Sequence, residues 1–275
     1  MVLVDGKIAL GNIPKRSADT HKGDYGRVLI FSGSKQYVGA PFFAAQAAVN
    51  AGSGLVYLTI PECIWSPLAQ KLNEPIFLTY DSEFDALKTI LNQRADVCLI
   101  GPGLGTEMRS VVRESIRSLS CPIVLDADGL NAIAKTPEIL KEATAPLVLT
   151  PHPGEFARLF PKYDVSNRAE CALKFANTYG VTLVLKGHRT LTATADGRLY
   201  ENTSGNPGMA KGGSGDVLAG VIASLIGQGI APDVAAYTGV WLHGYAGDLC
   251  KEKFGEYGMT PTDLLGSLKT ALREC

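Results

Sequence analysis

The sequence has no excess charge of either sign and no long hydrophobic run. Its 275 residues include 26 Lys and Arg and 27 Asp and Glu, which gives a formal net charge of -1. A chain so close to neutrality is not expected to bind nucleic acid through bulk positive charge. Apolar stretches such as Val97–Ile100 and Val217–Ile226 are too short to supply the roughly 20 residues that span a bilayer. We therefore expect neither nucleic acid nor a membrane as a partner.

Cysteine pairs and an export signal are also missing. The six cysteines are scattered and none forms a CxxC pair, so we expect buried, reduced thiols rather than a disulfide framework. The four histidines do not cluster with cysteine at the spacing of a zinc site. The N-terminal segment carries Asp5 and Lys7 and has no continuous apolar core of the secretory kind. A cytoplasmic location is therefore expected.

Present instead are 30 glycines and short apolar runs that alternate with helical patterns. Runs that are apolar throughout are typical of strands in a parallel sheet covered on both faces. The expected strands are Arg27–Ser32, Leu55–Ile60, Val97–Gly101, Pro122–Asp126, Leu147–Thr150 and Thr182–Lys186. The expected helices include Pro41–Ala51, Thr106–Leu119 and Asn167–Tyr179, the last ended by Gly180. This rhythm predicts an α/β fold with a doubly wound, mostly parallel central sheet flanked by helices, formed by one domain over residues 1–275.

A different pattern occurs late in the chain. Residues Thr190–Glu201 alternate between apolar and polar types around Asp196-Gly197, which is typical of a β-hairpin with a tight turn. Because its strands are antiparallel, we expect this hairpin to lie at the edge of the otherwise parallel sheet.

Small and polar residues follow most of the expected strands. Examples are the loops Gly101–Gly103, Asp126–Gly129, Thr150–Gly154 and Lys186–His188. In open parallel sheets the ligand binds beyond the carboxyl ends of the strands. We therefore expect the functional site at this edge of the sheet.

The strongest local signal is a glycine-rich loop that leads into a helix. Gly212–Gly215 precede Asp216, after which apolar residues recur at helical spacing until Gly227. A helix start exposes unpaired amides and the positive end of the helix dipole, and so favours phosphate or a developing oxyanion. Asp216 has two interpretations: it caps the helix, or it takes a proton from a substrate hydroxyl while the loop amides stabilise a transferring phosphoryl group.

Four common motifs are absent. The sequence has no GxxxxGK[ST] loop, and Gly101–Thr106 has Thr where GxGxxG requires its last Gly. Gly212–Asp216 ends in Asp and is not a GxSxG elbow, and no HExxH occurs. These absences argue against P-loop NTPases, classical dinucleotide-dependent dehydrogenases, α/β-hydrolases and zinc metalloproteases.

Three further segments, taken together with the glycine-rich loop, indicate a known family. They are Val124–Ala134 (VLDADGLNAIA), Leu149–Leu159 (LTPHPGEFARL) and Val184–Thr190 (VLKGHRT). With Asn206–Asp216 (NPGMAKGGSGD), the sequence resembles the NAD(P)H-hydrate dehydratases of the ribokinase-like superfamily, from about Tyr25 to the C-terminus. The resemblance implies a ribokinase-like fold and a bacterial stand-alone enzyme with no epimerase domain before it.

The resemblance implies a repair reaction. Reduced nicotinamide cofactors hydrate at C6 of the ring and then no longer donate hydride; the family removes this water at the expense of a nucleoside phosphate. The expected enzyme is an ADP-dependent (S)-NAD(P)H-hydrate dehydratase, a lyase that returns NADH hydrate and NADPH hydrate to NADH and NADPH while ADP gives AMP and phosphate. Phosphorylation of the C6 hydroxyl would supply the leaving group. ATP stays open as the donor, and Mg²⁺ is expected because phosphoryl transfer from a nucleotide normally uses it.

The same resemblance assigns candidate site residues position by position. Asp216 matches the family's base, with Gly213, Ser214 and Gly215 as the anion-binding loop. The substrate-binding candidates are Ala40, Gly103, His152, Asn131, Glu155 and Asp216. The nucleotide-binding candidates are Lys186, Gly187, His188, Arg189, Thr190 and Gly215.

Several positions also have purely structural interpretations. His152 can be a turn histidine bonded to the backbone, and Lys186 can be a solvated lysine at a strand end. Four side chains with carboxylate or amide oxygens can orient Mg²⁺ through water, namely Asp126, Asp128, Asn131 and Glu155. They can equally cap helices, an interpretation that suits Asp128. The metal ligands are therefore left unassigned.

Two other functions fit the same loop. A ribokinase-like kinase of a vitamin precursor, such as a hydroxymethylpyrimidine or a hydroxyethylthiazole, would share Asp216 but leave its product phosphorylated, whereas a dehydratase releases inorganic phosphate. A non-catalytic nucleotide sensor would bind nucleotide without turnover and needs no base. The segments Leu149–Leu159 and Asn206–Asp216 favour the dehydratase by their resemblance. The resemblance also implies a homo-oligomer, for example a tetramer.

Overall fold

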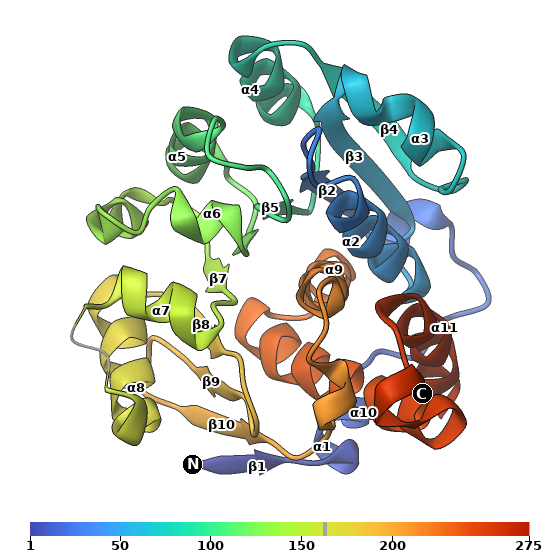
Figure 1. Ribbon diagram of the computed structural model, residues 1–275, viewed down its shortest axis with the longest axis vertical. Coiled ribbons are helices and arrows are strands. Elements are labelled where there is room, and N and C mark those ends of the chain that lie inside the picture. Colours follow the sequence, from blue (N-terminus) through green and yellow to red (C-terminus); the bar gives the residue numbers. More distant parts are fainter. Residues whose placement is uncertain (162–163, 275) are drawn as a thin grey trace.

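The computed structural model describes residues 1–161 and 164–274. In these residues ten strands form one sheet: β1 Val2–Val4, β2 Arg27–Phe31, β3 Leu55–Pro61, β4 Ile76–Tyr80, β5 Val97–Ile100, β6 Ile123–Leu125, β7 Leu147–Leu149, β8 Thr182–Leu185, β9 Leu191–Ala193 and β10 Leu199–Asn202. Their spatial order is β1-β10-β9-β8-β7-β6-β5-β2-β3-β4 (Figure 1). All neighbours from β8 to β4 in this order run parallel, and β9 runs antiparallel to β8 and β10. The predicted doubly wound, mostly parallel sheet is confirmed.

Helices cover both faces of this sheet. The described helices are α1 Gly6–Gly11, α2 Gly39–Asn50, α3 Trp65–Ala69, α4 Glu83–Asn92, α5 Arg109–Ser118, α6 Asp128–Asn131, α7 Pro153–Leu159, α8 Arg168–Tyr179, α9 Ser214–Gly227, α10 Pro232–Gly258 and α11 Pro261–Ala271. α2, α9, α10 and α11 pack on one face, and α4, α5 and α8 pack on the other (Figure 1). Every residue of β5, β6, β7 and β8 is consequently buried, which is why these strands are apolar except at Thr182.

The six strands predicted from apolar runs all form, and most end one residue earlier than expected. The residues left outside the strands are Ser32, Gly101, Asp126, Thr150 and Lys186. Each of them starts a loop beyond the carboxyl end of its strand. The polar edge that the sequence indicated is therefore formed by loops rather than by strand ends.

The late hairpin forms, but the prediction that it lies at the edge was wrong. β9 and β10 pair antiparallel across the turn at Asp196-Gly197. β1 pairs in parallel with the outer side of β10, so β1 is the edge strand. Neither β1 nor β4, at the two edges, has a run of buried apolar residues, and the sequence pattern predicted neither of them.

Helix ends follow local backbone chemistry. Gly180 ends α8 with φ of 67°, in the left-handed region, as predicted for a C-terminal cap. α2 begins at Gly39, before the predicted start at Pro41, and α5 begins at Arg109, after the predicted start at Thr106. The predicted helices are thus present with shifted boundaries.

The described cysteines are free thiols, and one of them is not buried. Cys98, Cys171 and Cys250 are buried and Cys121 is partly buried. Cys63 is exposed in the short turn after β3, which corrects the expectation that every thiol is buried; Cys275 lies outside the described residues. Within the described ranges, no helix has both the length and the apolar character needed to cross a membrane.

Candidate active site

The strand order of the sheet reverses between the neighbouring strands β2 and β5. β2 is followed outward by β3 and β4, and β5 then pairs with the other side of β2. At such a switch point the loops at the carboxyl ends diverge and open a crevice. Here the two loops are tied together, because the Ser32 hydroxyl and the Gly33 amide both donate to the carbonyl of Pro102, at 2.5 and 2.9 Å.

Two substrate-binding candidates meet beside this tie. Gly103 has φ of 66°, and a Cβ placed on it would lie 2.9 Å from the Cβ of Ala40 and 2.7 Å from the Cβ of Tyr37. Any side chain at this position would push the loop after β5 away from the start of α2. The glycine therefore allows the close approach that brings Ala40 and Gly103 side by side.

The glycine-rich loop turns directly into α9, with Asp216 in the first turn of the helix. Gly213 has φ of 104°, a conformation that favours glycine. The amide of Ser214 donates to the carbonyl of Lys211 at 3.2 Å. The amides of Gly215 and Asp216 follow it in the first turn, where the helix offers amides no carbonyl of its own. They point out of the helix end and can bind an anion.

A buried ion pair lies next to this turn. Lys186 Nζ, after β8, is 2.8 Å from Oδ1 of Asp126, after β6, and the same oxygen accepts a hydrogen bond from the Thr150 hydroxyl at 2.7 Å. Lys186 Nζ also lies 4.0 Å from Oε2 of Glu155. A Cβ placed on Gly215 would be 3.3 Å from Lys186 Nζ, so the ammonium lies against the glycine-rich loop. The fold thus brings Lys186, Glu155 and Gly215 together.

The surroundings of Asp216 suit a proton acceptor. Burial raises the pKa of Asp216 to about 7, and the negative charge of Asp126 adds to this effect while Lys186 opposes it. A general base works best when its pKa is near the operating pH. Burial lowers the pKa of Lys186, but the charges of Asp126 and Glu155 outweigh burial and raise that pKa overall, so the ammonium keeps its charge.

His152 is held by a capping box at the start of α7. Its Nδ1 accepts hydrogen bonds from the amides of Gly154 and Glu155 at 3.0 and 3.3 Å, and the Glu155 carboxylate accepts one from the His152 amide at 2.8 Å. The interpretation of a turn histidine bonded to the backbone is therefore correct for Nδ1. Nε2 lies 3.4 Å from Glu155 Oε1 on an exposed ring, which leaves this side of the ring accessible to a substrate.

Asp128 and Asn131 fasten loops around the site. The Asp128 carboxylate accepts hydrogen bonds from the amide of Gly105 at 2.8 Å and from Nδ2 of Asn131 at 3.1 Å. Asn131 Oδ1 accepts one from Nε of Arg158 at 3.1 Å. The capping interpretation of Asp128 was wrong: the N-cap of α6 is Ala127, at φ of 47°, and the carboxylate turns instead to the loop after β5.

The predicted nucleotide-binding segment forms a turn between β8 and β9. The Thr190 hydroxyl donates to the carbonyl of Gly187 at 2.9 Å, and Arg189 has φ of 53°. Gly187, His188 and Arg189 are exposed, and Arg189 pairs with a glutamate of β10. Of this segment, Lys186 alone joins the ion pair with Asp126 among the contacts of the described residues. Gly187, His188 and Arg189 form the adjoining surface turn, and Thr190 is buried at its end.

Sequence reasoning missed a histidine beneath the loop. His243 is buried on α10, and its Nε2 lies 2.9 Å from the carbonyl oxygen of Ser214. No motif spacing linked these residues, because the contact joins two separate helices, α9 and α10, whose packing the sequence pattern does not give. The one available signal was a polar residue inside a largely apolar helix, which needs a partner when buried.

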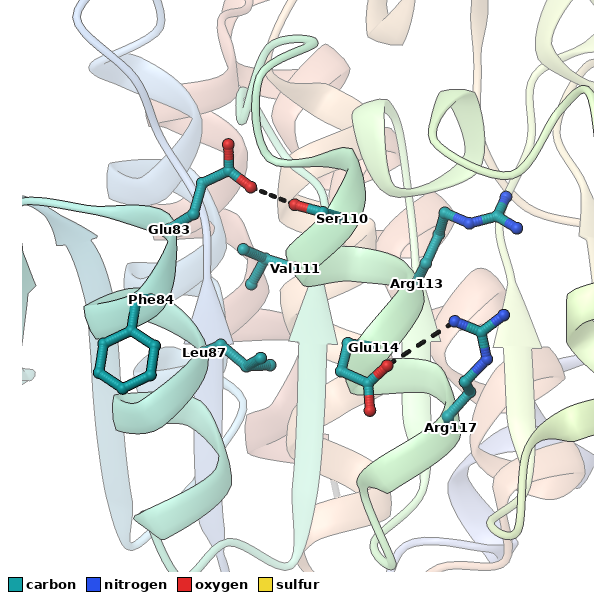
Figure 2. A pocket seen from close by; sticks show the side chains of 8 residues that line it. All are labelled: Glu83, Phe84, Leu87, Ser110, Val111, Arg113, Glu114 and Arg117. Atoms are coloured by element: carbon teal, nitrogen blue, oxygen red, sulfur yellow. Dashed lines mark hydrogen bonds and ion pairs between the residues drawn. The ribbon is translucent and has the colours of Figure 1, made fainter.

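A separate hollow shares no residue with this site. It has a volume of about 600 Å³, lies between α4 and α5, and is lined by Glu83, Phe84, Leu87, Ser110, Val111, Arg113, Glu114 and Arg117 (Figure 2). Its polar groups already have partners: the Ser110 hydroxyl donates to Glu83, Arg113 donates to Thr136, and Arg117 lies 3.7 Å from Glu114 and 2.6 Å from Glu142. We therefore do not include it in the candidate active site.

The sequence matches one family over most of its length. The family model for NAD(P)H-hydrate dehydratase covers residues 28–270. The ADP-dependent (S)-NAD(P)H-hydrate dehydratase of Listeria monocytogenes is 36% identical over 267 residues, which cover 95% of this chain and 92% of the relative. The bifunctional NAD(P)H-hydrate repair enzyme of Moorella thermoacetica is 44% identical over 274 residues, or 95% of this chain and 52% of that protein. The chain thus spans about half the length of this bifunctional relative.

Solved structures agree with this match. A ribokinase-like superfamily protein of Enterococcus faecalis has a TM-score of 0.89 and 28% identity, covering 99% of this chain and 95% of that one. The ADP/ATP-dependent NAD(P)H-hydrate dehydratase of Bacillus subtilis, co-crystallised with ATP/Mg²⁺, has a TM-score of 0.86 and 28% identity, covering 97% and 95%. The expected ribokinase-like fold is confirmed.

Proposed function

The chain belongs to the NAD(P)H-hydrate dehydratase family, and from this premise we propose that it restores (S)-NADH hydrate and (S)-NADPH hydrate at the expense of ADP or ATP. One observation carries the proposal: Asp216, with a pKa of about 7, follows the open amides of the glycine-rich loop, against which the Lys186 ammonium lies. A base, anion-binding amides and a fixed cation are the groups that phosphoryl transfer to a hydroxyl requires. Family membership directs this chemistry to the hydrated nicotinamide ring.

In the proposed first step, Asp216 accepts the proton of the C6 hydroxyl. The hydroxyl oxygen attacks the terminal phosphorus of the nucleotide, and the bond from that phosphorus to its bridging oxygen breaks, so that ADP leaves as AMP. The amides of Gly215 and Asp216 donate to the oxygens of the transferring group, and Lys186 Nζ offsets their charge. Asp216 holds the proton at the end of this step.

The second step is an elimination. The lone pair of the ring nitrogen expels phosphate from C6, and the C–O bond breaks with its electron pair on the phosphate. The departing phosphate then accepts the proton from C5, and the electrons of that C–H bond form the C5–C6 double bond. Hydroxide is a poor leaving group and phosphate is a good one, which explains why the repair consumes a nucleotide. The products are the reduced cofactor, inorganic phosphate and AMP when ADP is the donor.

We assign the hydrate and the nucleotide to opposite sides of Lys186. The hydrate would lie beside Ala40 and Gly103, with the exposed ring of His152 as a contact. The nucleotide would lie on the turn Gly187–Thr190, which directly follows Lys186 at the carboxyl end of β8. This arrangement puts the phosphates over the start of α9. The bonds that Asn131 and Glu155 make to their neighbours would hold the substrate side of the site in shape.

We propose that Mg²⁺ is bound mainly by the nucleotide phosphates. Across residues 1–161 and 164–274, no three His, Cys, Asp or Glu side chains come together in a way that could hold a metal ion. Two nearby carboxylates already have partners: Asp126 accepts a hydrogen bond from Lys186, and Asp128 accepts one from the amide of Gly105. The protein side chains therefore do not fit a metal site of their own. Mg²⁺ typically keeps several waters and binds substrate phosphates, and no step above uses a protein ligand to it.

The test follows the near-ultraviolet absorbance of reduced nicotinamide. NADH hydrate, and NADPH hydrate in parallel, are mixed with the protein, Mg²⁺ and either ADP or ATP. We expect the absorbance band to return only with nucleotide and inorganic phosphate to appear, and Asp216→Asn to abolish both. No return with either nucleotide, while nucleotide still binds, would overturn the dehydratase. A phosphorylated vitamin precursor would then identify the kinase, and binding without any turnover would identify the sensor.

We further propose that residues 1–275 act as one domain, in a cytoplasmic homo-oligomer such as a tetramer. Exposed apolar side chains, among them Phe84 and Tyr257, are available for contacts between copies. Light scattering measures the assembly, limited proteolysis tests for a single resistant core, and cell fractionation tests the location.

A further inference from the structure

The loop that leads into α9 is anchored mainly to α10 and also to Met259 just after it, whose carbonyl accepts a hydrogen bond from Lys211 Nζ. The carboxylate of Asp248, on α10, accepts hydrogen bonds from the amide of Gly205 at 2.8 Å and from Nδ2 of Asn206 at 2.9 Å. Lys211 Nζ donates to the carbonyl of Tyr257, near the end of the same helix, at 2.7 Å. These two links hold the beginning and the middle of the loop, before it reaches its glycines.

A third link, from His243, reaches the end of the loop. The ring is buried in α10, and its Nε2 lies 2.9 Å from the carbonyl oxygen of Ser214, the first residue of α9. A carbonyl oxygen can only accept, so Nε2 carries the hydrogen. Burial lowers the pKa of His243 to about 4; the hydrogen bond to Ser214 opposes this effect and the ammonium of Lys186 adds to it, so the ring is neutral near pH 7. The donor is therefore a single, fixed N–H group.

The carbonyl of Ser214 and the amide of Gly215 belong to the same peptide unit. This unit is planar and trans, so its C=O and N–H point in opposite directions. In the first turn of a helix the C=O points along the helix and the N–H points out of its N-terminus. We propose that His243 is a positioning residue, which holds the Ser214 carbonyl and thereby aims the Gly215 amide at the transferring phosphoryl group. This inference rests on the function proposed above.

The identity of the neighbouring residues supports this role. Leu242 and Ala246, on the same helix, are fully buried and apolar, so packing alone does not call for an imidazole between them. A buried polar ring gains nothing over an apolar one unless its hydrogen bond is made. The hydrogen bond of His243 ends on the Ser214–Gly215 peptide unit, which is one of the two that carry an anion-binding amide.

The test compares three variants by steady-state kinetics with NADH hydrate and ADP. His243→Met keeps most of the side-chain volume and removes the donor, and we expect kcat to fall roughly 10- to 100-fold while KM changes little, because an oxyanion donor is misaligned. His243→Gln retains an N–H donor at the ε position and is expected to recover most of the loss. Leu242→Ala, the matched control, loses buried packing on the same helix; it is expected to lower the melting temperature and leave kcat unchanged.

A binding measurement tests the same inference without turnover. The β-phosphate distinguishes ADP from AMP, so the ratio of their affinities reports the phosphate-binding amides. Calorimetry should show that His243→Met narrows this ratio roughly tenfold, in line with the loss of one charge-assisted hydrogen bond, while the affinity for AMP is unchanged.

The outcomes are distinct. An unchanged kcat and an unchanged affinity ratio in His243→Met would overturn the inference, and so would equal losses of kcat in His243→Met and Leu242→Ala. If the parent protein restores no reduced nicotinamide, the proposed function fails, and the affinity ratio alone then decides the role of His243. Should His243→Met not fold, His243→Asn takes its place, because its amide is polar but too short to reach the Ser214 carbonyl.

Discussion

Asp216 is harder to ionise in the folded protein than in the unfolded chain. Burial, aided by Asp126, raises its pKa from the ordinary 3.8 to about 7. Between these two values the folded state binds more protons than the unfolded state, so the free energy of unfolding decreases as pH rises through this window. Above pH 7 the whole penalty is present. The residue best suited to act as a base is therefore one that destabilises the fold at working pH.

Replacing this carboxylate should separate stability from activity. We expect Asp216→Asn to lose turnover by orders of magnitude and to gain on the order of 1 to 4 kcal/mol of unfolding free energy at pH 8. The gain should shrink as pH falls from 8 to 4 and disappear only below the ordinary pKa of 3.8, where the carboxyl of the parent is protonated in both states. Melting curves from pH 4 to 8 measure this, with exposed Asp19→Asn as the control. A gain that does not vary with pH would contradict the raised pKa.

The sequence revealed the site residues whose contacts are close in the chain, and it missed those whose contacts join distant positions. Asp216 and the glycines before it were predictable, because a loop and the helix it enters are local in the chain. The ion pair between Lys186 and Asp126 was not, since its members are 60 positions apart and meet only through the order of β6, β7 and β8. His243 was missed for the same reason, because its partner lies on another helix.

At the scale of elements, the sequence pattern predicted the strands that are buried on both sides. β5 to β8 are almost entirely apolar because helices cover both of their faces. The edge strands β1 and β4 mix exposed and buried residues and gave no such pattern. The turn sequence predicted the hairpin, but its predicted place in the sheet was wrong. The N-terminal strand β1 pairs with β10, and nothing in the hairpin sequence indicates this pairing.

Two glycines at positive φ allow a controlled test of the loop that leads into α9. Gly213 (φ 104°) and Gly180 (φ 67°) both adopt conformations that cost alanine about 1 kcal/mol. A Cβ at Gly213 would also lie 2.7 Å from the ring of Phe43, whereas nothing lies within 4 Å of one at Gly180. We expect both Ala variants to be less stable in urea, and only Gly213→Ala to lose turnover, because its loop must move. Full activity in Gly213→Ala would show that the loop position is not critical.

At the scale of the molecule, the sheet order assembles the site from distant parts of the chain. The loops after β2, β5, β6, β7 and β8 all open at one edge, and α9 begins beside them (Figure 1). Sequence reasoning could place the site at this edge, because the carboxyl ends of parallel strands meet there. It could not say which side chains touch, since that depends on the sheet order and on the helix packing.

A ligand bound across these loops should stabilise the whole fold. If nucleotide binds only the folded state, ADP at about 100 times its Kd adds about 2.7 kcal/mol to the free energy of unfolding. For a chain of this size we expect the melting temperature to rise by roughly 5 °C or more. Gly215→Val should abolish the rise, because its Cβ would lie 3.3 Å from Lys186 Nζ and the rest of the side chain would fill the phosphate-binding turn. Gly266→Val, with nothing within 4 Å of its Cβ, should keep the rise in melting temperature and serves as the control. A full rise in Gly215→Val would show that the phosphates do not bind at the start of α9.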